Sequence, residues 1–62
     1  MADRGAIIRQ RRILKRMTQA QLCEVTGLTR QTIVDLEAGR FEPSEATYRD
    51  ILQKIESYEK AA

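Results

Sequence analysis

Residues 18–44 read TQAQLCEVTGLTRQTIVDLEAGRFEPS, and this stretch decides the fold. Thr18 stands three residues before Gln21, which is the spacing of a capping box, so we expect a helix to begin just after Thr18. An apolar stripe continues to Gly27, where the missing Cβ permits the left-handed backbone that ends a helix. The first part of the stretch therefore predicts one short helix with a defined start and end.

A second short helix is expected after only two further residues. Thr29 is the next N-cap candidate, and Gly39 closes the segment. Ile33 and Leu36 supply an inward apolar face, which predicts a helix from about Arg30 to Ala38. So short a link forces the two helices to cross at a large angle, which is the helix-turn-helix arrangement.

A longer helix is expected before this stretch, from about Asp3 to Lys15, because only Gly5 interrupts residues that favour a helix there. Its apolar residues recur at spacings that can share one helical face, and they are Ile7, Ile8, Leu14 and Met17.

A last helix is expected after Pro43, since proline disfavours helix at the residue before it and Ser44 can serve as the cap. This helix can run on to Tyr58. Its apolar stripe should bury one face of the helix. We favour the core over an interface for the stripe as a whole, but for Tyr58 we favour contact with a partner. The stripe consists of Tyr48, Ile51, Leu52, Ile55 and Tyr58, of which Tyr48, Ile55 and Tyr58 are the candidate dimer contacts.

Length and composition limit the possible classes of protein. The 62 residues fit one all-α domain, a small four-helix bundle over residues 1–62 with its helix-turn-helix core at residues 18–38. With Cys23 as the single cysteine and no histidine, a disulfide within the chain and a Cys/His zinc site are excluded, and no metal or cofactor is expected. Ala20 and Cys23 are the small residues expected at the helix crossing, which makes Cys23 structural.

Several further functions are disfavoured by what the sequence lacks. No segment near Met1 resembles a signal peptide and none is long enough to span a membrane, so we expect a cytoplasmic protein with no membrane partner. An enzyme is not expected, because the chain has no histidine, no phosphate-binding loop and no paired carboxylate site.

Charge is unevenly distributed along the chain. The net charge is +2, but residues 1–40 carry eight basic and four acidic residues, whereas residues 41–62 carry three basic and five acidic ones. The first two thirds of the chain would attract a polyanion such as DNA, and the remainder would not.

Residues 18–44 resemble the Cro and phage-repressor type of helix-turn-helix protein, also called the Xre family. The resemblance implies a lambda-repressor-like domain that binds double-stranded DNA, in a prokaryotic or phage-encoded protein associated with the nucleoid. It is carried by Met17, Thr18, Gln19, Leu22, Gly27, Leu28, Thr29, Arg30, Gln31, Thr32, Ile33, Leu36, Glu37, Gly39, Arg40, Pro43 and Ser44.

The resemblance implies that the second helix of the motif enters the major groove, amino end first. The residues then expected to face the bases are Arg30, Gln31, Val34 and Asp35. Helical spacing agrees independently, because residues 30 and 34, like residues 31 and 35, share the side opposite residues 33 and 36. Contacts to the DNA backbone, which position the protein without specifying sequence, are expected from Gln19, Thr29, Thr32, Arg40 and Arg12.

The side chains at the base-facing positions suit this role. Arg30 can donate two hydrogen bonds to guanine O6 and N7, and Gln31 can pair with adenine N6 and N7. Val34 suits a thymine methyl group. Asp35 has two uses that remain open: it can accept a hydrogen bond from cytosine N4, or orient Gln31 one helical turn earlier.

The resemblance also implies a partly buried ion pair between Arg12 and Glu37, which would set the register of the first helix against the recognition helix. At one point the chain departs from the family. Family members often carry glycine or asparagine where the first helix ends, whereas this chain has Arg16, which must take a strained left-handed conformation or follow a different link.

These observations favour a sequence-specific transcriptional regulator, a repressor that binds a palindromic operator as a homodimer. The alternative is an interaction module built on the same fold, such as the antitoxin of a toxin and antitoxin pair, whose partner would be a protein.

Overall fold

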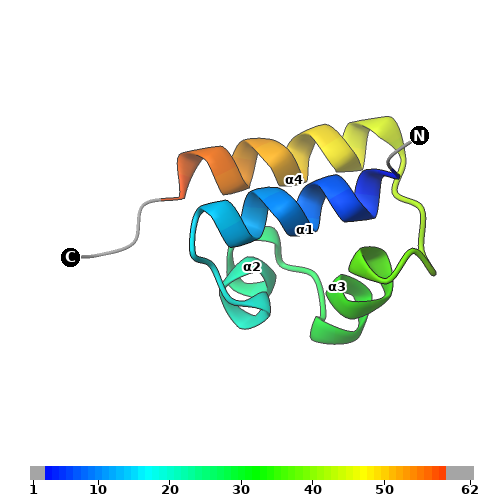
Figure 1. Cartoon of the computed structure of the whole chain (residues 1–62), viewed down its shortest axis with the longest axis horizontal. Helices are drawn as coiled ribbons and strands as arrows, with labels where there is room; N and C mark the ends of the chain where they lie inside the picture. The colour runs from blue at the N-terminus through cyan, green and yellow to red at the C-terminus, as the bar shows by residue number, and fades with distance from the viewer. Residues whose placement is uncertain (1–2, 59–62) are drawn as a thin grey trace.

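The computed structural model describes residues 3–58, and this part of the chain forms four α-helices and no strand (Figure 1). The helices are α1 (Arg4–Leu14), α2 (Gln19–Thr26), α3 (Arg30–Glu37) and α4 (Glu45–Ser57). The expected all-α, four-helix class is confirmed. Within the described residues, no helix has the length and apolar character needed to cross a membrane.

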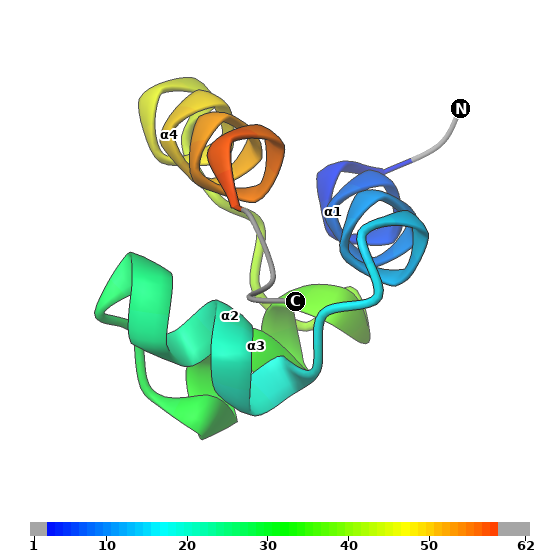
Figure 2. The ribbon, with the colours of Figure 1, turned by 90° about the vertical axis from the view of Figure 1, so that its left-hand side faces the viewer.

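The four helices form two layers. Helices α1 and α4 lie side by side and run in the same direction, and α2 and α3 lie together beneath them (Figures 1 and 2). The largest sets of contacts join α1 to α4 and α2 to α3, and further contacts join α1 to α3 and α2 to α4. The helix-turn-helix pair is thus supported from one side by the two longer helices.

The ends of α2 follow from local chemistry. Thr18 Oγ1 accepts from the Gln21 amide at 3.0 Å while Gln21 Oε1 accepts from the Thr18 amide at 2.9 Å, which is the predicted capping box. At the other end Gly27 has a φ of 75°, the left-handed backbone that glycine adopts without strain. The predicted start and end of this helix are both confirmed.

The neighbouring helices begin at the predicted caps as well. Thr29 Oγ1 accepts from the Thr32 amide, and Ser44 Oγ accepts from the Thr47 amide, both at 3.2 Å. Helix α3 ends at Glu37, one residue before the expected end, and α4 ends at Ser57, because the backbone of Tyr58 is already extended.

The turn after α1 contains the left-handed residue that was one of the two possibilities predicted from the sequence for Arg16. Arg16 has a φ of 58°, so it is left-handed as expected. Its amide donates to the Ile13 carbonyl at 2.9 Å and the Met17 amide donates to the Arg12 carbonyl at 3.1 Å. These are the two hydrogen bonds of a Schellman motif, which here has arginine where glycine is usual. Because the motif also buries Met17, the packing of that side chain offsets the strain at Arg16.

Seven apolar residues form the core among the described residues. They come from all four helices and from the turn after α1, and they are Ile8, Met17, Leu22, Ile33, Leu36, Ile51 and Ile55. Cys23 is half-buried against this cluster, which fits its structural assignment.

Two expectations about burial were wrong, and Ile55 takes the core position favoured for its stripe in place of the dimer contact. Leu14 is 72% exposed, because six residues of helix turn it away from the core residue Ile8. Ala20 is exposed, so that Cys23 alone is the small residue packed on the core side of α2. Ile55 is fully buried by the other helices, so it belongs to the core and cannot serve as the dimer contact proposed for it.

Gly5 has a packing role that the sequence did not reveal. A Cβ atom built on Gly5 would lie 1.9 Å from the carbonyl oxygen of Leu36, far inside van der Waals contact. Helix α1 can therefore approach the end of α3 this closely only because residue 5 has no side chain.

Replacing Gly5 with alanine should lower the free energy of unfolding by about 1–3 kcal/mol, because the new methyl group forces α1 away from α3. At an ordinary helical position the same change would stabilise the helix by about 1 kcal/mol. Thermal unfolding followed by circular dichroism measures the effect, with Gln10→Ala, at an exposed position of the same helix, as the control. An unfolding midpoint equal to or above that of the unchanged protein would contradict the close approach.

Candidate nucleic-acid interface

Helix α3 divides into an inward face and an outward face, as the helical spacing predicted. Ile33 and Leu36 are fully buried. On the other side, Arg30 and Gln31 at the amino end are exposed, and the remaining two base-facing candidates, Val34 and Asp35, are half-buried. The short polar helix thus presents its first turn to solvent while its last turn is held in the core.

One carboxylate oxygen of Asp35 contacts two of the other candidate residues. Gln31 Nε2 donates to Asp35 Oδ1 at 3.0 Å, one helical turn away. Arg40, in the loop after α3, places Nη1 3.4 Å from the same oxygen. The structure therefore contains the contact that one of the two uses of Asp35, orienting Gln31, requires, and a hydrogen bond to cytosine N4 stays a prediction.

The two threonines expected at the DNA backbone hold the start of α3. Thr29 caps the helix, and the hydroxyl groups of Thr29 and Thr32 lie 2.8 Å apart in a hydrogen bond. Both lie at the same end of α3 as Arg30. A phosphate or sugar contact from either hydroxyl stays a prediction.

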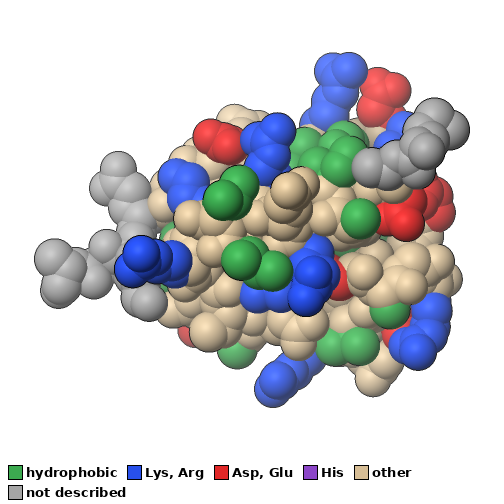
Figure 3. Space-filling view, in the orientation of Figure 1, with side chains coloured by type: hydrophobic (Ala, Val, Ile, Leu, Met, Phe, Trp, Pro, Cys, Tyr) green, Lys and Arg blue, Asp and Glu red, His purple; other side chains and the backbone are tan. Residues whose placement is uncertain are grey.

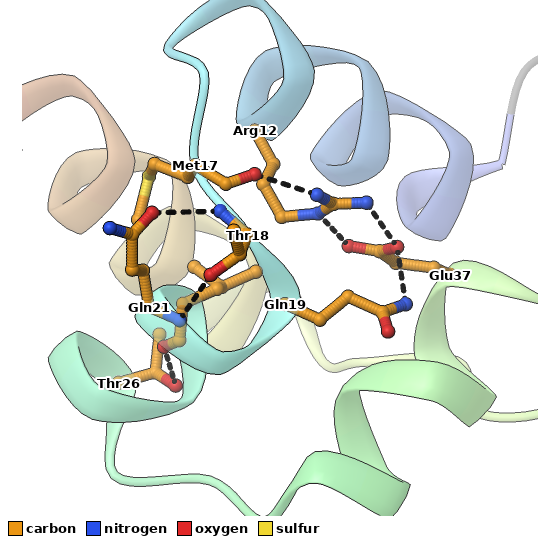
Figure 4. A network of polar contacts seen from close by, with 8 residues as sticks. Arg12, Met17, Thr18, Gln19, Gln21, Thr26 and Glu37 are labelled. Carbon is orange, nitrogen blue, oxygen red and sulfur yellow. Dashed lines mark hydrogen bonds and ion pairs between the residues drawn. The ribbon is translucent and has the colours of Figure 1, made fainter.

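A buried network connects α3 to the first two helices (Figure 4). Arg12 donates to both carboxylate oxygens of Glu37, from Nε at 2.7 Å and from Nη2 at 3.0 Å. The side chains are 12% and 4% exposed, respectively. The structure thus brings together the two residues that the family resemblance paired, in the two-pronged geometry that gives such contacts both strength and direction.

Two further partners complete this network. Arg12 Nη1 donates to the Met17 carbonyl at 2.8 Å, and Gln19 Nε2 donates to Glu37 Oε1 at 3.2 Å. The Glu37 carboxylate therefore accepts hydrogen bonds from α1 and from the start of α2 at once. Every buried side-chain nitrogen and oxygen among the described residues has a hydrogen-bond partner.

These contacts reduce the number of N–H groups that Arg12 and Gln19 can donate to DNA. Arg12 uses three of its five N–H donors within the protein, so a phosphate contact would depend on the other two. Gln19 uses one of its two amide hydrogens and keeps the second, at the first residue of α2, where free backbone amides also favour an anion.

Two parts of this arrangement were not found from the sequence. The Met17 carbonyl is a backbone group, and no residue type marks it as a partner of Arg12. The contact between Gln19 and Glu37 joins residues 18 positions apart. The capping box fixes where Gln19 stands at the start of α2, but only the packing of α2 on α3 shows which side chain it meets.

The basic excess of residues 1–40 is partly neutralised by acidic residues further along the chain. Arg11 pairs with Glu56 at 3.3 Å, and Arg4 lies 3.8 Å from Glu42. In Figure 3, Lys and Arg side chains are spread over this face, at its upper and lower edges, in its middle and at the end where α1 finishes, with acidic side chains among them. Charge alone therefore does not delimit the interface, and the exposed face of α3 is the more specific feature.

Comparisons with known proteins agree with this geometry. Residues 8–59 match the model of a family described as helix-turn-helix. A protein of Methanothermobacter thermautotrophicus described as an uncharacterized HTH-type transcriptional regulator is 50% identical over 38 residues, which are 61% of this chain. The matched stretch spans 55% of that relative, or about half its length. No solved structure matches the chain.

The family match covers most of the chain: it includes α1 from residue 8 onward, all of α2, α3 and α4, the Arg12 and Glu37 pair and the exposed face of α3. The chain therefore belongs to the helix-turn-helix family of the Cro and phage-repressor type.

Proposed function

We propose that this protein is a sequence-specific repressor that binds a palindromic operator as a homodimer, with α3 in the major groove. The observation that carries the proposal is the division of α3. Its buried face, Ile33 and Leu36, anchors the helix, while Arg30 and Gln31 remain exposed at the end that would enter the groove first. Repression needs no further activity, because occupying the operator is enough to block a promoter.

Base reading and backbone binding divide between two sets of residues in this proposal. Arg30, Gln31, Val34 and Asp35 face the bases, while the DNA backbone is held by Gln19, Thr29, Thr32 and Arg40, with the two free N–H groups of Arg12. Gln19 supports the division, because it stands at the amino end of α2 with one amide hydrogen still available. Residues 1–62 would act together as one domain.

The homodimer would use the outer part of α4. Tyr48 and Tyr58 are half-buried and remain candidates after the exclusion of Ile55. The Arg4 guanidinium lies over the Tyr48 ring, 5.5 Å from its centre. Tyr58 lines a shallow hollow together with Val25 and Lys54. To read a palindrome, a second copy packed here must set the two α3 helices about one turn of DNA apart.

Selection of bound sequences from random DNA tests the proposal as a whole. The selected sites should share a two-fold motif with half-sites about one helical turn, or roughly 10 base pairs, apart. Sedimentation of the protein with the selected site should give two chains per duplex. Recovery of no common sequence would contradict sequence-specific binding, and a single chain on each tight palindromic site would contradict the homodimer.

Alanine variants should separate base reading from backbone binding. Arg30→Ala or Gln31→Ala should weaken binding to the selected site by about 5-fold to 100-fold, the value of one two-pronged base contact, and spare nonspecific binding. Gln19→Ala or Arg40→Ala should weaken binding to all sequences, and Arg40→Ala, which removes a positive charge, should also lower the salt dependence of binding. Binding is measured by fluorescence anisotropy at several salt concentrations.

Arg11→Ala is the matched control, since Arg11 is an exposed arginine of α1 that pairs with Glu56 of α4, in the layer away from α2 and α3. It should change neither kind of binding. If Arg30→Ala and Gln31→Ala leave the sequence preference intact, the assignment of the reading face is wrong.

A further inference from the structure

Asp35 is an unexpected residue for a DNA-reading face, because phosphate groups repel a carboxylate. Its side chain is 32% exposed, and Oδ1 has two partners on the protein surface. One is Nε2 of Gln31 at 3.0 Å, and the other is Nη1 of Arg40 at 3.4 Å. The positive charge of Arg40 beside this oxygen partly offsets the repulsion between the carboxylate and the phosphate groups.

The contact from Gln31 limits what its amide can offer to a base. A glutamine amide has one oxygen that accepts hydrogen bonds and two N–H groups that donate. Asp35 occupies one N–H group and thereby fixes which way the amide points. Gln31 is left with one acceptor and one donor for DNA.

This remaining pattern distinguishes between the two purines. In the major groove adenine presents the N6 amino donor and the N7 acceptor, whereas guanine presents two acceptors, O6 and N7. One acceptor and one donor match adenine. A two-pronged contact to guanine would require both N–H groups of Gln31, and one of them is held by Asp35.

We propose that Asp35 is a positioning residue that restricts Gln31 to adenine and makes it reject guanine. The inference rests on the proposed function, since it concerns the base pair that α3 reads. Asp35 acts through Gln31 and contacts no base itself, so its effect should appear as a change in discrimination at one base pair.

The test uses the full chain and the DNA site obtained by selection. The base pair read by Gln31 is the one at which Gln31→Ala erases the preference. At that pair, the ratio of the dissociation constants for the G·C and A·T duplexes is measured at one fixed salt concentration. The unchanged protein should favour the A·T duplex by about fivefold or more, the discrimination expected of one two-pronged contact.

Asp35→Ala should bring this ratio close to one, because both N–H groups of Gln31 become available. Asp35→Asn is the conservative control: its side-chain oxygen still accepts from Gln31, so the ratio should stay within about twofold of the original. In a Gln31→Ala background, Asp35→Ala should leave the ratio unchanged, since the two residues act through one contact. Asp35→Leu, similar in size but without an acceptor, replaces the alanine variant if circular dichroism shows that Asp35→Ala is unfolded.

The outcomes separate the inference from the proposed function. If the unchanged protein selects no sequence, the proposed function fails. If it selects a site and Asp35→Ala or Asp35→Leu keeps the adenine preference, Asp35 does not position Gln31 and the inference is overturned. Loss of the preference in Asp35→Asn as well would also overturn it, because the acceptor would then not be what matters.

Discussion

The arrangement of the first three helices depends on the carboxylate of Glu37. Both of its oxygens accept from Arg12 of α1, and one also accepts from Gln19 at the start of α2. With its side chain 4% exposed, this charge is satisfied by protein groups and hardly by water. Removing one partner would leave the other buried and unpaired, which costs far more than the net stabilisation of the intact pair. We therefore infer that the network fixes the positions of α1, α2 and α3 relative to one another.

That relation sets the geometry of the proposed DNA-facing surface. Gln19 begins α2, Glu37 ends α3, and the residues proposed to face the bases lie on the opposite side of α3 from its core contacts. A shift of α2 against α3 would move the candidate phosphate contact at Gln19 away from the reading residues. Gly5 also helps to fix this geometry, because it lets α1 pack closely against the last turn of α3, next to Glu37.

The features that could be predicted from the sequence are those governed by neighbouring residues. Caps at Thr18, Thr29 and Ser44 are local hydrogen bonds, and the outward face of α3 follows from helical periodicity. Features that depend on packing were missed or misjudged. From the sequence, Gly5 only interrupts a run of residues that favour a helix, because the carbonyl it packs against, that of Leu36, is far away along the chain. Ile55 fitted the core and a dimer interface equally well in chemical terms, because either location buries an apolar side chain. The loop residue Arg40 was expected at phosphate, but its approach to Asp35 required the three-dimensional path of the chain.

The double variant Arg12→Met/Glu37→Leu tests most directly whether the network exists to place the reading surface. Apolar side chains can replace a buried ion pair with little loss of stability, so the variant should fold, as checked by circular dichroism and thermal unfolding. Its dissociation constants for the selected DNA site and for nonspecific DNA are then compared with those of the unchanged protein, because loss of a phosphate contact from Arg12 would weaken both alike. Our account predicts that binding to the selected site weakens by about fivefold or more beyond the change in nonspecific binding, since one misplaced base contact costs about 1–3 kcal/mol. A stably folded double variant that binds the site as tightly as the unchanged protein would contradict it.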